Sequence, residues 1–209
     1  MAIQIKTFPQ GLVNANCYVI FDDETKVSAI VDCSWFGLRF KAEIESLGIE
    51  KFDYILLTHG HFDHIMGVEK LQKSLGGKIV IHALDESCLS SDVDSRAELF
   101  GTSLHFEFKA DILVKDGDSL PFANTQIKVI HTPGHTVGGV CYEIENNLFT
   151  GDTLFKGTVG RTDFPNGSYA QIIESVKKLA ALEGDYNVYP GHEGSSTLDY
   201  ERKTNPYMK

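Results

Sequence analysis

Three histidines and one aspartate lie within six consecutive residues of this chain, and they have the residue types of a metal site. The run reads His59-Gly60-His61-Phe62-Asp63-His64. Neutral imidazole nitrogens and carboxylate oxygens are ligands that suit zinc, iron and manganese. A His-rich tract can also be an affinity tag or a solvated loop, but this one is internal and lies between two apolar segments. We therefore interpret it as a metal-binding sequence.

The segments on either side indicate how the cluster is positioned. Residues 52–57 are largely apolar and predict a short strand, and a helix is predicted by the spacing of the apolar residues that follow, Ile65, Val68, Leu71 and Leu75. Alternate side chains of an extended segment share a face, so His59, His61 and Asp63 are expected to point one way. His64, at the start of the helix, is expected to point another way. The run could thus serve two neighbouring metal positions.

Three later strands are followed by a similar residue. A histidine or aspartate stands beside a glycine just beyond each of the strands predicted at 127–130, 148–150 and 186–189, namely His135, Asp152 and His192. Each of these is weak evidence alone, because Pro-Gly is common in turns and an aspartate after glycine is ordinary in loops. Together with the first cluster they predict ligand loops at one edge of a sheet, held by a rigid scaffold.

The remaining pattern indicates strands and helices in both halves of the chain. Strands are predicted at 17–21, 27–31, 78–81, 112–114 and 140–144, and helices at 40–47 and after Ser168. Residues 84–109 are irregular, with a half-buried strand expected at 104–108. That segment could be a lid, a dimer contact or a packed surface excursion. No linker separates the halves, so one domain spanning residues 1–209 is expected.

Composition excludes several classes of function. The chain has 209 residues, with 29 acidic and 19 basic side chains and a formal net charge of −10. No basic run is present, and phosphate binding depends on clustered Lys and Arg, so no nucleic-acid partner is expected. No signal-peptide pattern opens the chain, and no apolar stretch is long enough to cross a membrane. We expect a cytoplasmic protein that does not bind membranes.

Four cysteines show no metal-binding or redox spacing. Cys17 and Cys141 lie in apolar, strand-like runs and are expected to be buried free thiols. Cys33 and Cys88 could be more exposed. A structural metal site is the last alternative for the histidine cluster, since structural zinc favours closed, thiolate-rich shells.

The ordered set of donors resembles the signature of the metallo-β-lactamase superfamily. The set is His59-x-His61-x-Asp63-His64, then His135, Asp152 and His192. The resemblance covers nearly the whole chain and implies an α/β (α+β) fold, an αββα sandwich of two mixed β-sheets flanked by helices. It implies that one metal is held by His59, His61 and His135, and a second by Asp63, His64 and His192, with Asp152 bridging them. His82, His105 and His131 match no ligand position, and we interpret them as structural.

Two divalent metal ions are therefore the implied cofactors, zinc first, with iron or manganese as alternatives. Metal binding lowers the pKa of water from 15.7 to about 7, which supplies a hydroxide nucleophile at neutral pH. A thiol leaving group has a pKa of roughly 8.5 and needs little help from an acid. Asp63 could orient the hydroxide and shuttle its proton as well as bind metal, which would make it catalytic.

Within this superfamily, the local sequence is most similar to glyoxalase II-like (hydroxyacylglutathione hydrolase-like) enzymes. Three segments carry the similarity, residues 132–136, 151–155 and 191–193, and residues 160–165 are similar to short bacterial members of that group. This implies hydrolysis of a small-molecule thioester such as S-lactoylglutathione. Arg161 falls where longer members place a lysine that contacts glutathione. Its guanidinium could pair with a substrate carboxylate, or it could form an internal salt bridge with Asp163.

Two departures and one second resemblance leave the substrate open. The C-terminal helical extension that helps longer members bind glutathione is not expected here, since the sequence ends soon after His192, and Asp163 replaces a tyrosine of those enzymes. The string 160–164 also resembles persulfide dioxygenases, which implies a single iron on His59, His135 and Asp152. Lactonase, β-lactamase and phosphodiesterase activities share the same metal chemistry. Both a monomer and a homodimer are compatible with the sequence.

Overall fold

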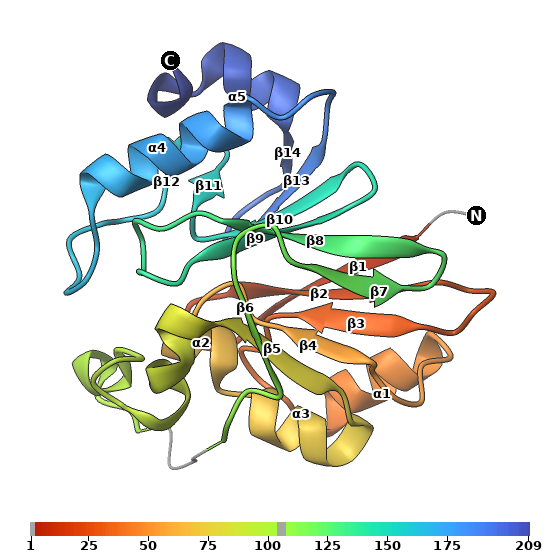
Figure 1. Cartoon of the computed structure of the whole chain (residues 1–209). Coiled ribbons are helices and arrows are strands. Elements are labelled where there is room, and N and C mark those ends of the chain that lie inside the picture. The colour runs from red at the N-terminus through yellow and green to blue at the C-terminus, as the bar shows by residue number, and fades with distance from the viewer. Residues whose placement is uncertain (1–2, 104–107) are drawn as a thin grey trace.

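Two six-stranded sheets packed face to face form the centre of the computed structural model, which describes residues 3–103 and 108–209 (Figure 1). The first sheet has the order β1-β2-β3-β4-β5-β6 and the second has the order β14-β13-β10-β9-β8-β7. A separate two-stranded hairpin joins β11 to β12. The two large sheets come from successive halves of the chain, as the sequence pattern indicated.

The first sheet is mixed. Its strands are β1 (Gln4–Gln10), β2 (Ala15–Phe21), β3 (Ser28–Val31), β4 (Tyr54–Leu56), β5 (Lys78–His82) and β6 (Ile112–Val114). The first three strands pair antiparallel, and β3 to β6 run parallel. Parallel neighbours need crossover connections. The connection from β3 to β4 carries helix α1 (Leu38–Ser46), and that from β4 to β5 carries α2 (Phe62–Ile65) and α3 (Val68–Leu75).

The second sheet is also mixed. Its strands are β7 (Ser119–Phe122), β8 (Thr125–His131), β9 (Val140–Ile144), β10 (Asn147–Gly151), β13 (Asn187–Pro190) and β14 (Ser196–Thr197). Only β10 and β13 pair in parallel. Between them lie β11 (Leu154–Phe155), β12 (Thr158–Val159) and helix α4 (Tyr169–Ala180). Helix α5 (Leu198–Thr204) and the 3-10 turn η3 (Pro206–Met208) follow β14.

Helices cover the outer face of each sheet, with α1, α2 and α3 on the first and α4 and α5 on the second (Figure 1). Three apolar layers result, one under each set of helices and one between the sheets. Strand β2 shows why. Cys17 and Val19 pack toward the helices, whereas Tyr18 and Ile20 pack toward the second sheet, because successive side chains of a strand point to opposite faces. The predicted αββα sandwich of two mixed sheets is confirmed.

Two details differ from the sequence prediction. The single helix predicted after the histidine cluster is two helices, α2 and α3, which are separated at Gly67. A Cβ at Gly67 would lie 2.6 Å from Cys33 Sγ and 2.8 Å from the Phe36 nitrogen, so the chain bends where it touches the segment after β3. The expectation that Cys33 and Cys88 are more exposed is wrong, because both thiols are buried. Strands β1 and β7 and helix α5 were not predicted.

The irregular segment 84–109 contains two 3-10 helices, η1 (Ala83–Ser90) and η2 (Ala97–Phe100). The strand expected at 104–108 falls largely on residues 104–107, which lie outside the described residues, as does His105.

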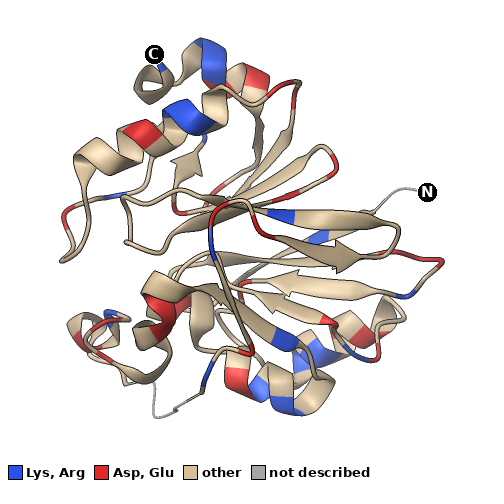
Figure 2. Cartoon of the chain, viewed as in Figure 1, with Lys and Arg blue, Asp and Glu red and all other residues tan. Residues whose placement is uncertain are grey.

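Lys and Arg are interspersed with Asp and Glu along the outer helices (Figure 2). Within residues 3–103 and 108–209, no helix has the length and apolar character required to span a bilayer.

Candidate metal centre

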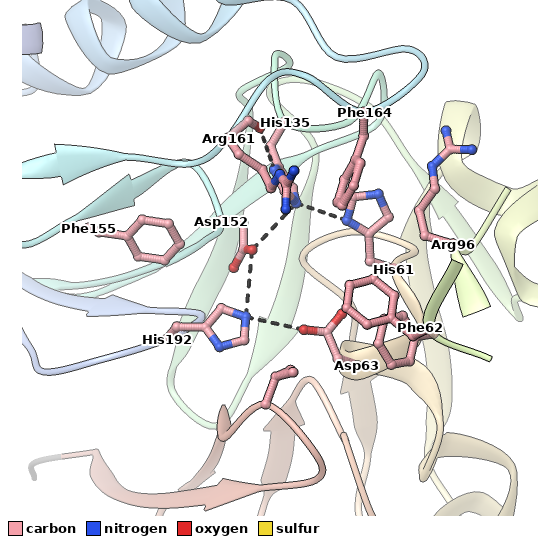
Figure 3. A pocket seen from close by; sticks show the side chains of 12 residues that line it. His61, Phe62, Asp63, Arg96, His135, Asp152, Phe155, Arg161, Phe164 and His192 are labelled. Carbon is pink, nitrogen blue, oxygen red and sulfur yellow. Dashed lines mark hydrogen bonds and ion pairs between the residues drawn. The ribbon is translucent and has the colours of Figure 1, made fainter. Parts of the chain in front are cut away.

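The predicted donor residues meet at one edge of the sandwich, where strands of both sheets end. The segment that follows β4 carries His59, His61, Asp63 and His64. The segment after β8 carries His135, and Asp152 and His192 come directly after β10 and soon after β13. Donors from four strand ends are thereby brought together from a sequence span of more than 130 residues. Figure 3 shows five of these side chains around one cavity.

The donor atoms form two neighbouring sets. His59, His61 and His135, here called the first donor set, have ligand atoms within 4.8 Å of one another. Asp63, His64 and His192, the second donor set, meet the same condition, and so does a third combination of His59, His64 and Asp152. The third combination takes one histidine from each set.

Asp152 lies between the two sets. Its Oδ2 is 3.4 Å from His135 Nε2 and 3.7 Å from His192 Nε2 (Figure 3). Its Oδ1 is 3.5 Å from His64 Nε2. One carboxylate therefore reaches histidines of both sets. This is the position that a bridging ligand would occupy.

The expected direction of Asp63 is wrong. Alternation along an extended segment placed Asp63 on the side of His59 and His61, but its Oδ2 is 3.2 Å from His192 Nε2 in the second donor set. The reason is that α2 begins at Phe62, so the extended backbone ends at His61. Beyond that point the helical rotation carries Asp63 and His64 to the same set.

Three of the imidazoles are oriented by a hydrogen bond at Nδ1, the ring nitrogen that points away from the other donor atoms. His64 Nδ1 lies 2.8 Å from Asp32 Oδ2, His135 Nδ1 lies 2.7 Å from the Arg161 carbonyl oxygen, and His59 Nδ1 lies 3.1 Å from Thr58 Oγ1. Each leaves its Nε2 facing the donor set, which is the arrangement that fixes tautomer and ring direction in metal sites. His61 is reversed, with its Nδ1 only 2.8 Å from His135 Nε2.

Three buried polar atoms of this centre lack a hydrogen-bond partner among the described residues. They are His59 Nε2, His64 Nε2 and Asp152 Oδ1. Buried polar atoms are nearly always bonded, so converging orphans of this kind call for a ligand. Imidazole nitrogen and carboxylate oxygen without thiolate suit zinc, iron or manganese. The residues therefore fit two divalent metal ions.

Glycine allows the backbone to pass close to the donors. A Cβ at Gly191 would lie 2.2 Å from Asp152 Oδ1 and 2.9 Å from His64 Cε1. A side chain there would displace the carboxylate from between the two sets. This gives a physical reason for the glycine that precedes His192.

The electrostatics of the first donor set favour neutral imidazoles. Burial, and then the neighbouring imidazoles, lower the pKa of His59 and that of His61 well below the ordinary value. A neutral ring offers a lone pair, which is the form that binds metal.

The electrostatics of the second donor set favour a positive charge inside a ring of carboxylates. Burial alone would lower the pKa of His64, but Asp63, Asp32 and Asp152 raise it to about 10. Burial would likewise raise the pKa of Asp63, but His64 and His192 hold it well below the ordinary value. A proton on His64 is stabilised here by the same carboxylates that would stabilise a metal cation.

Asp32 supports the second donor set and was not singled out from the sequence. It lies at the end of β3 with a φ of 56°, accepts hydrogen bonds from Thr58 N and Thr58 Oγ1 at 2.8 Å each, and holds His64. Its position in the sequence is a feature that could have identified it, because Asp32 stands just beyond a strand, as several of the donors do.

Asp85 is a second supporting carboxylate that the sequence did not reveal. It is buried in η1 and accepts hydrogen bonds from Gly60 N at 3.2 Å, Thr136 Oγ1 at 2.7 Å and Gly138 N at 2.7 Å. It thereby joins the loop that carries His59 and His61 to the loop that carries His135. No local pattern marks a residue whose partners are so far away in sequence.

Arg161 lies at the cavity but its guanidinium is engaged inside the chain. Its Nε and one Nη donate to the two carboxylate oxygens of Asp163, both at 2.7 Å, and its Cζ lies 3.9 Å from the centroid of the Phe164 ring. The internal salt bridge with Asp163 is therefore present, and pairing of Arg161 with a substrate carboxylate stays a prediction. His82 and His131 lie in neither donor set and stack on each other with centroids 4.2 Å apart.

A cavity of about 380 Å³ opens beside the two sets. Five of its lining residues are donors, and the others are four phenylalanines, Val13, Arg96 and Arg161. The donors thus face a space large enough for a small molecule.

Known proteins share both the sequence and the shape of this chain. The family model described as the Metallo-beta-lactamase superfamily matches residues 10–192. Hydroxyacylglutathione hydrolase GloC of Haemophilus influenzae is 33% identical over 210 residues, which cover 99% of this chain and 98% of that protein.

Two solved structures superpose closely. The B3 metallo-beta-lactamase BLEG-1 has a TM-score of 0.91 at 29% identity, over 99% of this chain and 100% of that one. TTHA1623, solved in a di-iron-bound form, has a TM-score of 0.83 at 28% identity, over 97% and 99% of the two chains. The same fold therefore accompanies more than one named activity and at least one two-metal centre.

Proposed function

The chain belongs to the metallo-beta-lactamase superfamily, and from that premise we propose that it is a thioester hydrolase that works with two divalent metal ions. The observation that carries the proposal is the pair of three-residue donor sets joined by Asp152. Similarity to the hydroxyacylglutathione hydrolase of Haemophilus influenzae supports the thioester class. The proposed ligands are the three residues of each donor set and Asp152 between them.

When bound, divalent ions at these sets would lower the pKa of water to about 7 and polarise a carbonyl group. Zinc is the first choice, and iron or manganese suit the same donors. The chain's own residues then have to hold the substrate, keep the reacting water in place and move its proton.

Asp63 is proposed to handle that proton. Its carboxylate lines the cavity and remains ionised, since His64 and His192 hold its pKa well below the ordinary value. In the reaction, the oxygen of water bonds to the carbonyl carbon and the carbon–sulfur bond breaks. A carboxylic acid and a thiol result, with the proton that water gives up finally carried by the thiol sulfur. In this proposal Asp63 accepts that proton first.

The residues of the cavity wall favour a reaction whose leaving group needs no proton donor. Among the described residues that line it, those outside the donor sets and Asp152 are Val13, four phenylalanines and two arginines. An arginine does not give up its proton in a protein. Thiolate leaves readily without protonation, whereas an amine or alkoxide leaving group needs a proton donor.

The test is hydrolysis by protein loaded with known metal. Chain loaded with two equivalents of zinc should cleave a panel of acyl thioesters, which includes S-lactoylglutathione, and the metal-free chain should not. His135→Ala should abolish turnover, whereas Lys178→Ala, which removes an exposed ion pair with Asp116, should not affect it. Intact thioesters after incubation with the two-metal form would refute the proposal.

The alternative of a single-iron persulfide dioxygenase stays a prediction. It requires one iron per chain and oxygen uptake with a persulfide. A cytoplasmic location, the monomer or homodimer, and the absence of a nucleic-acid partner also stay predictions.

A further inference from the structure

Apart from the donors and two arginines, the cavity beside the donor sets is lined by apolar side chains, four phenylalanines and Val13. We propose that this apolar lining selects an apolar, branched or ring-sized acyl group, and that Val13, Phe62 and Phe100 are the residues that select it. The inference rests on the proposed thioester hydrolysis and narrows its substrate class.

The three residues come from different parts of the chain and line the same cavity as the donors. Val13 belongs to the turn between β1 and β2, Phe62 follows His61 directly at the start of α2, and Phe100 ends η2. The rings of Phe62 and Phe100 lie 4.7 Å apart between centroids. Phe62 lies beside Asp63 in the cavity (Figure 3). An acyl chain held here would lie next to the donor atoms.

Two of these side chains leave apolar surface in water. Phe100 is 49% exposed and Val13 is 40% exposed. Burial of such surface contributes about 25 cal/mol per Å². A substrate with an apolar acyl group would remove this surface from water, whereas a small polar acyl group would leave most of it wet.

The two arginines at the cavity offer little to a substrate carboxylate. Arg96 is only 6% exposed, and its Nη1 and Nη2 donate to the carbonyl oxygens of Val93 at 2.9 Å and Pro165 at 2.5 Å, while its Nε has no hydrogen-bond partner among the described residues. Arg161 is held by both carboxylate oxygens of Asp163. No other lysine or arginine of the described residues lines this cavity. Because Arg96 is buried and Arg161 is paired with Asp163, a thiol with carboxylates, such as glutathione, gains little from either cation, and recognition falls on the acyl side.

The cavity also separates the two ends of the substrate. Phe62 lies on the Asp63 side of the donors, and Arg161 lies on the His135 side (Figure 3). An acyl group against Phe62 and Phe100 directs the sulfur toward Arg161, which is exposed to solvent. A departing thiolate is stabilised by water better than by phenylalanine rings.

The experiment varies the acyl group and the thiol separately. Zinc-loaded protein is assayed with phenylacetyl, 3-methylbutanoyl, acetyl and D-lactoyl thioesters of N-acetylcysteamine, and with the same acyl groups on glutathione. We expect kcat/KM for phenylacetyl to exceed that for lactoyl by at least about tenfold, the range over which apolar pockets discriminate. Exchange of the thiol should change kcat/KM less than exchange of the acyl group.

Variants assign the preference to the named residues. Phe100→Ala should reduce the ratio of phenylacetyl to lactoyl kcat/KM by about tenfold, and Val13→Thr should reduce it through polarity at nearly constant size. Both side chains are partly exposed, so neither change removes a core residue. Leu99→Ala is the matched control, because Leu99 lies on the same 3-10 helix, is 58% exposed and does not line the cavity.

The outcomes separate the two proposals. The inference is overturned, and thioester hydrolysis is retained, if the active protein has a higher kcat/KM for lactoyl than for phenylacetyl thioesters. The same holds if kcat/KM depends more on the thiol than on the acyl group. A preference that Phe100→Ala and Leu99→Ala change equally also overturns it. Protein that cleaves none of the thioesters at two equivalents of zinc overturns the proposed function itself.

Discussion

A single carboxylate orients a single imidazole in the second donor set. Asp32 Oδ2 holds His64 Nδ1 at 2.8 Å, and Thr58 in turn holds both oxygens of Asp32. The His64 ring can therefore present only Nε2 to a metal. The oriented ring, more than its presence alone, should determine affinity at this position.

Asp32→Asn tests this orientation. The amide keeps the size of the side chain but weakens the bond to His64, so affinity for the second metal equivalent should fall by about 10- to 100-fold. Competition with a calibrated chelator measures it. Asp22→Asn is the control, since Asp22 is buried in a turn where it binds Thr25, away from the donors. Equal loss of affinity in both variants would contradict the account.

The seven donor residues could be predicted individually because their signal is local. His59, His61, Asp63 and His64 lie in one run, and the other three donors stand beside a glycine just past an apolar strand. Asp32 also stands just past an apolar strand but has no glycine beside it. Local reasoning could not have reached Asp85, whose partners Gly60, Thr136 and Gly138 are distant in sequence, because only the fold brings them together.

At the scale of elements, Asp85 fastens two donor loops to one 3-10 helix. The loop after β4 is held through Gly60 N, and the loop after β8 is held through Thr136 Oγ1 and Gly138 N. The first donor set is drawn from these two loops. Its geometry should therefore depend on a residue that is itself no metal ligand.

Asp85→Asn should loosen the first donor set. The amide nitrogen cannot accept the hydrogen bonds made by one carboxylate oxygen, and a buried donor left unsatisfied costs about 1–3 kcal/mol. We expect a lower kcat and an altered visible spectrum of the cobalt-substituted protein. Glu86→Gln makes the same charge change on the next residue of η1 and should leave both unchanged. An unchanged cobalt spectrum in Asp85→Asn would show that the two loops hold their geometry without this carboxylate.

A second pair of elements, β5 and β8, is joined at the strand ends by the stacked rings of His82 and His131. Burial, and then the charge of His131, lower the pKa of His82 below its ordinary value of 6.5. The unfolded chain therefore binds more protons than the folded chain as pH falls through 6.5. The free energy of unfolding should decrease over that range.

His82→Gln should make stability less sensitive to acid. Denaturant unfolding of the metal-free protein at pH 7.5 and 5.5 measures the difference, and the decrease on acidification should be smaller in the variant than in the parent chain. Metal-free protein is used so that release of metal on acidification does not contribute to the difference. An identical decrease in both proteins would show that this pair does not contribute.

Elements were predictable where their apolar pattern is strong. Strands β2, β5 and β9 are buried and were expected close to their observed bounds. Strand β1 was missed because its side chains are half-buried or exposed. The division of α2 from α3 was missed because it depends on contact between Gly67 and the segment after β3, which apolar spacing does not encode.

At the scale of the whole molecule, three apolar layers hold the sandwich together and the donors occupy one edge of it. The sequence pattern indicated two sets of strands and helices that would pack as two sheets flanked by helices, and the family resemblance implied the αββα order of these layers. Which acyl group fits could not be predicted, because the cavity wall combines Val13, Phe62 and Phe100 from separate segments.

Removal of metal should consequently abolish activity without unfolding the chain. Each layer is apolar and independent of the donor residues, so the far-UV circular dichroism spectrum should persist after chelation. Bound metal adds stability only by mass action, which is about 2.7 kcal/mol at a hundredfold excess over Kd, so Tm should fall and recover on metal addition. Loss of the spectrum on chelation would mark the site as structural.

The most direct test of the account is a titration of the metal-free chain with zinc while thioester hydrolysis is followed. We predict that activity rises to a plateau at two equivalents per chain, because two donor sets share Asp152. A plateau at one equivalent, or no hydrolysis at any loading, would contradict the two-metal thioester hydrolase.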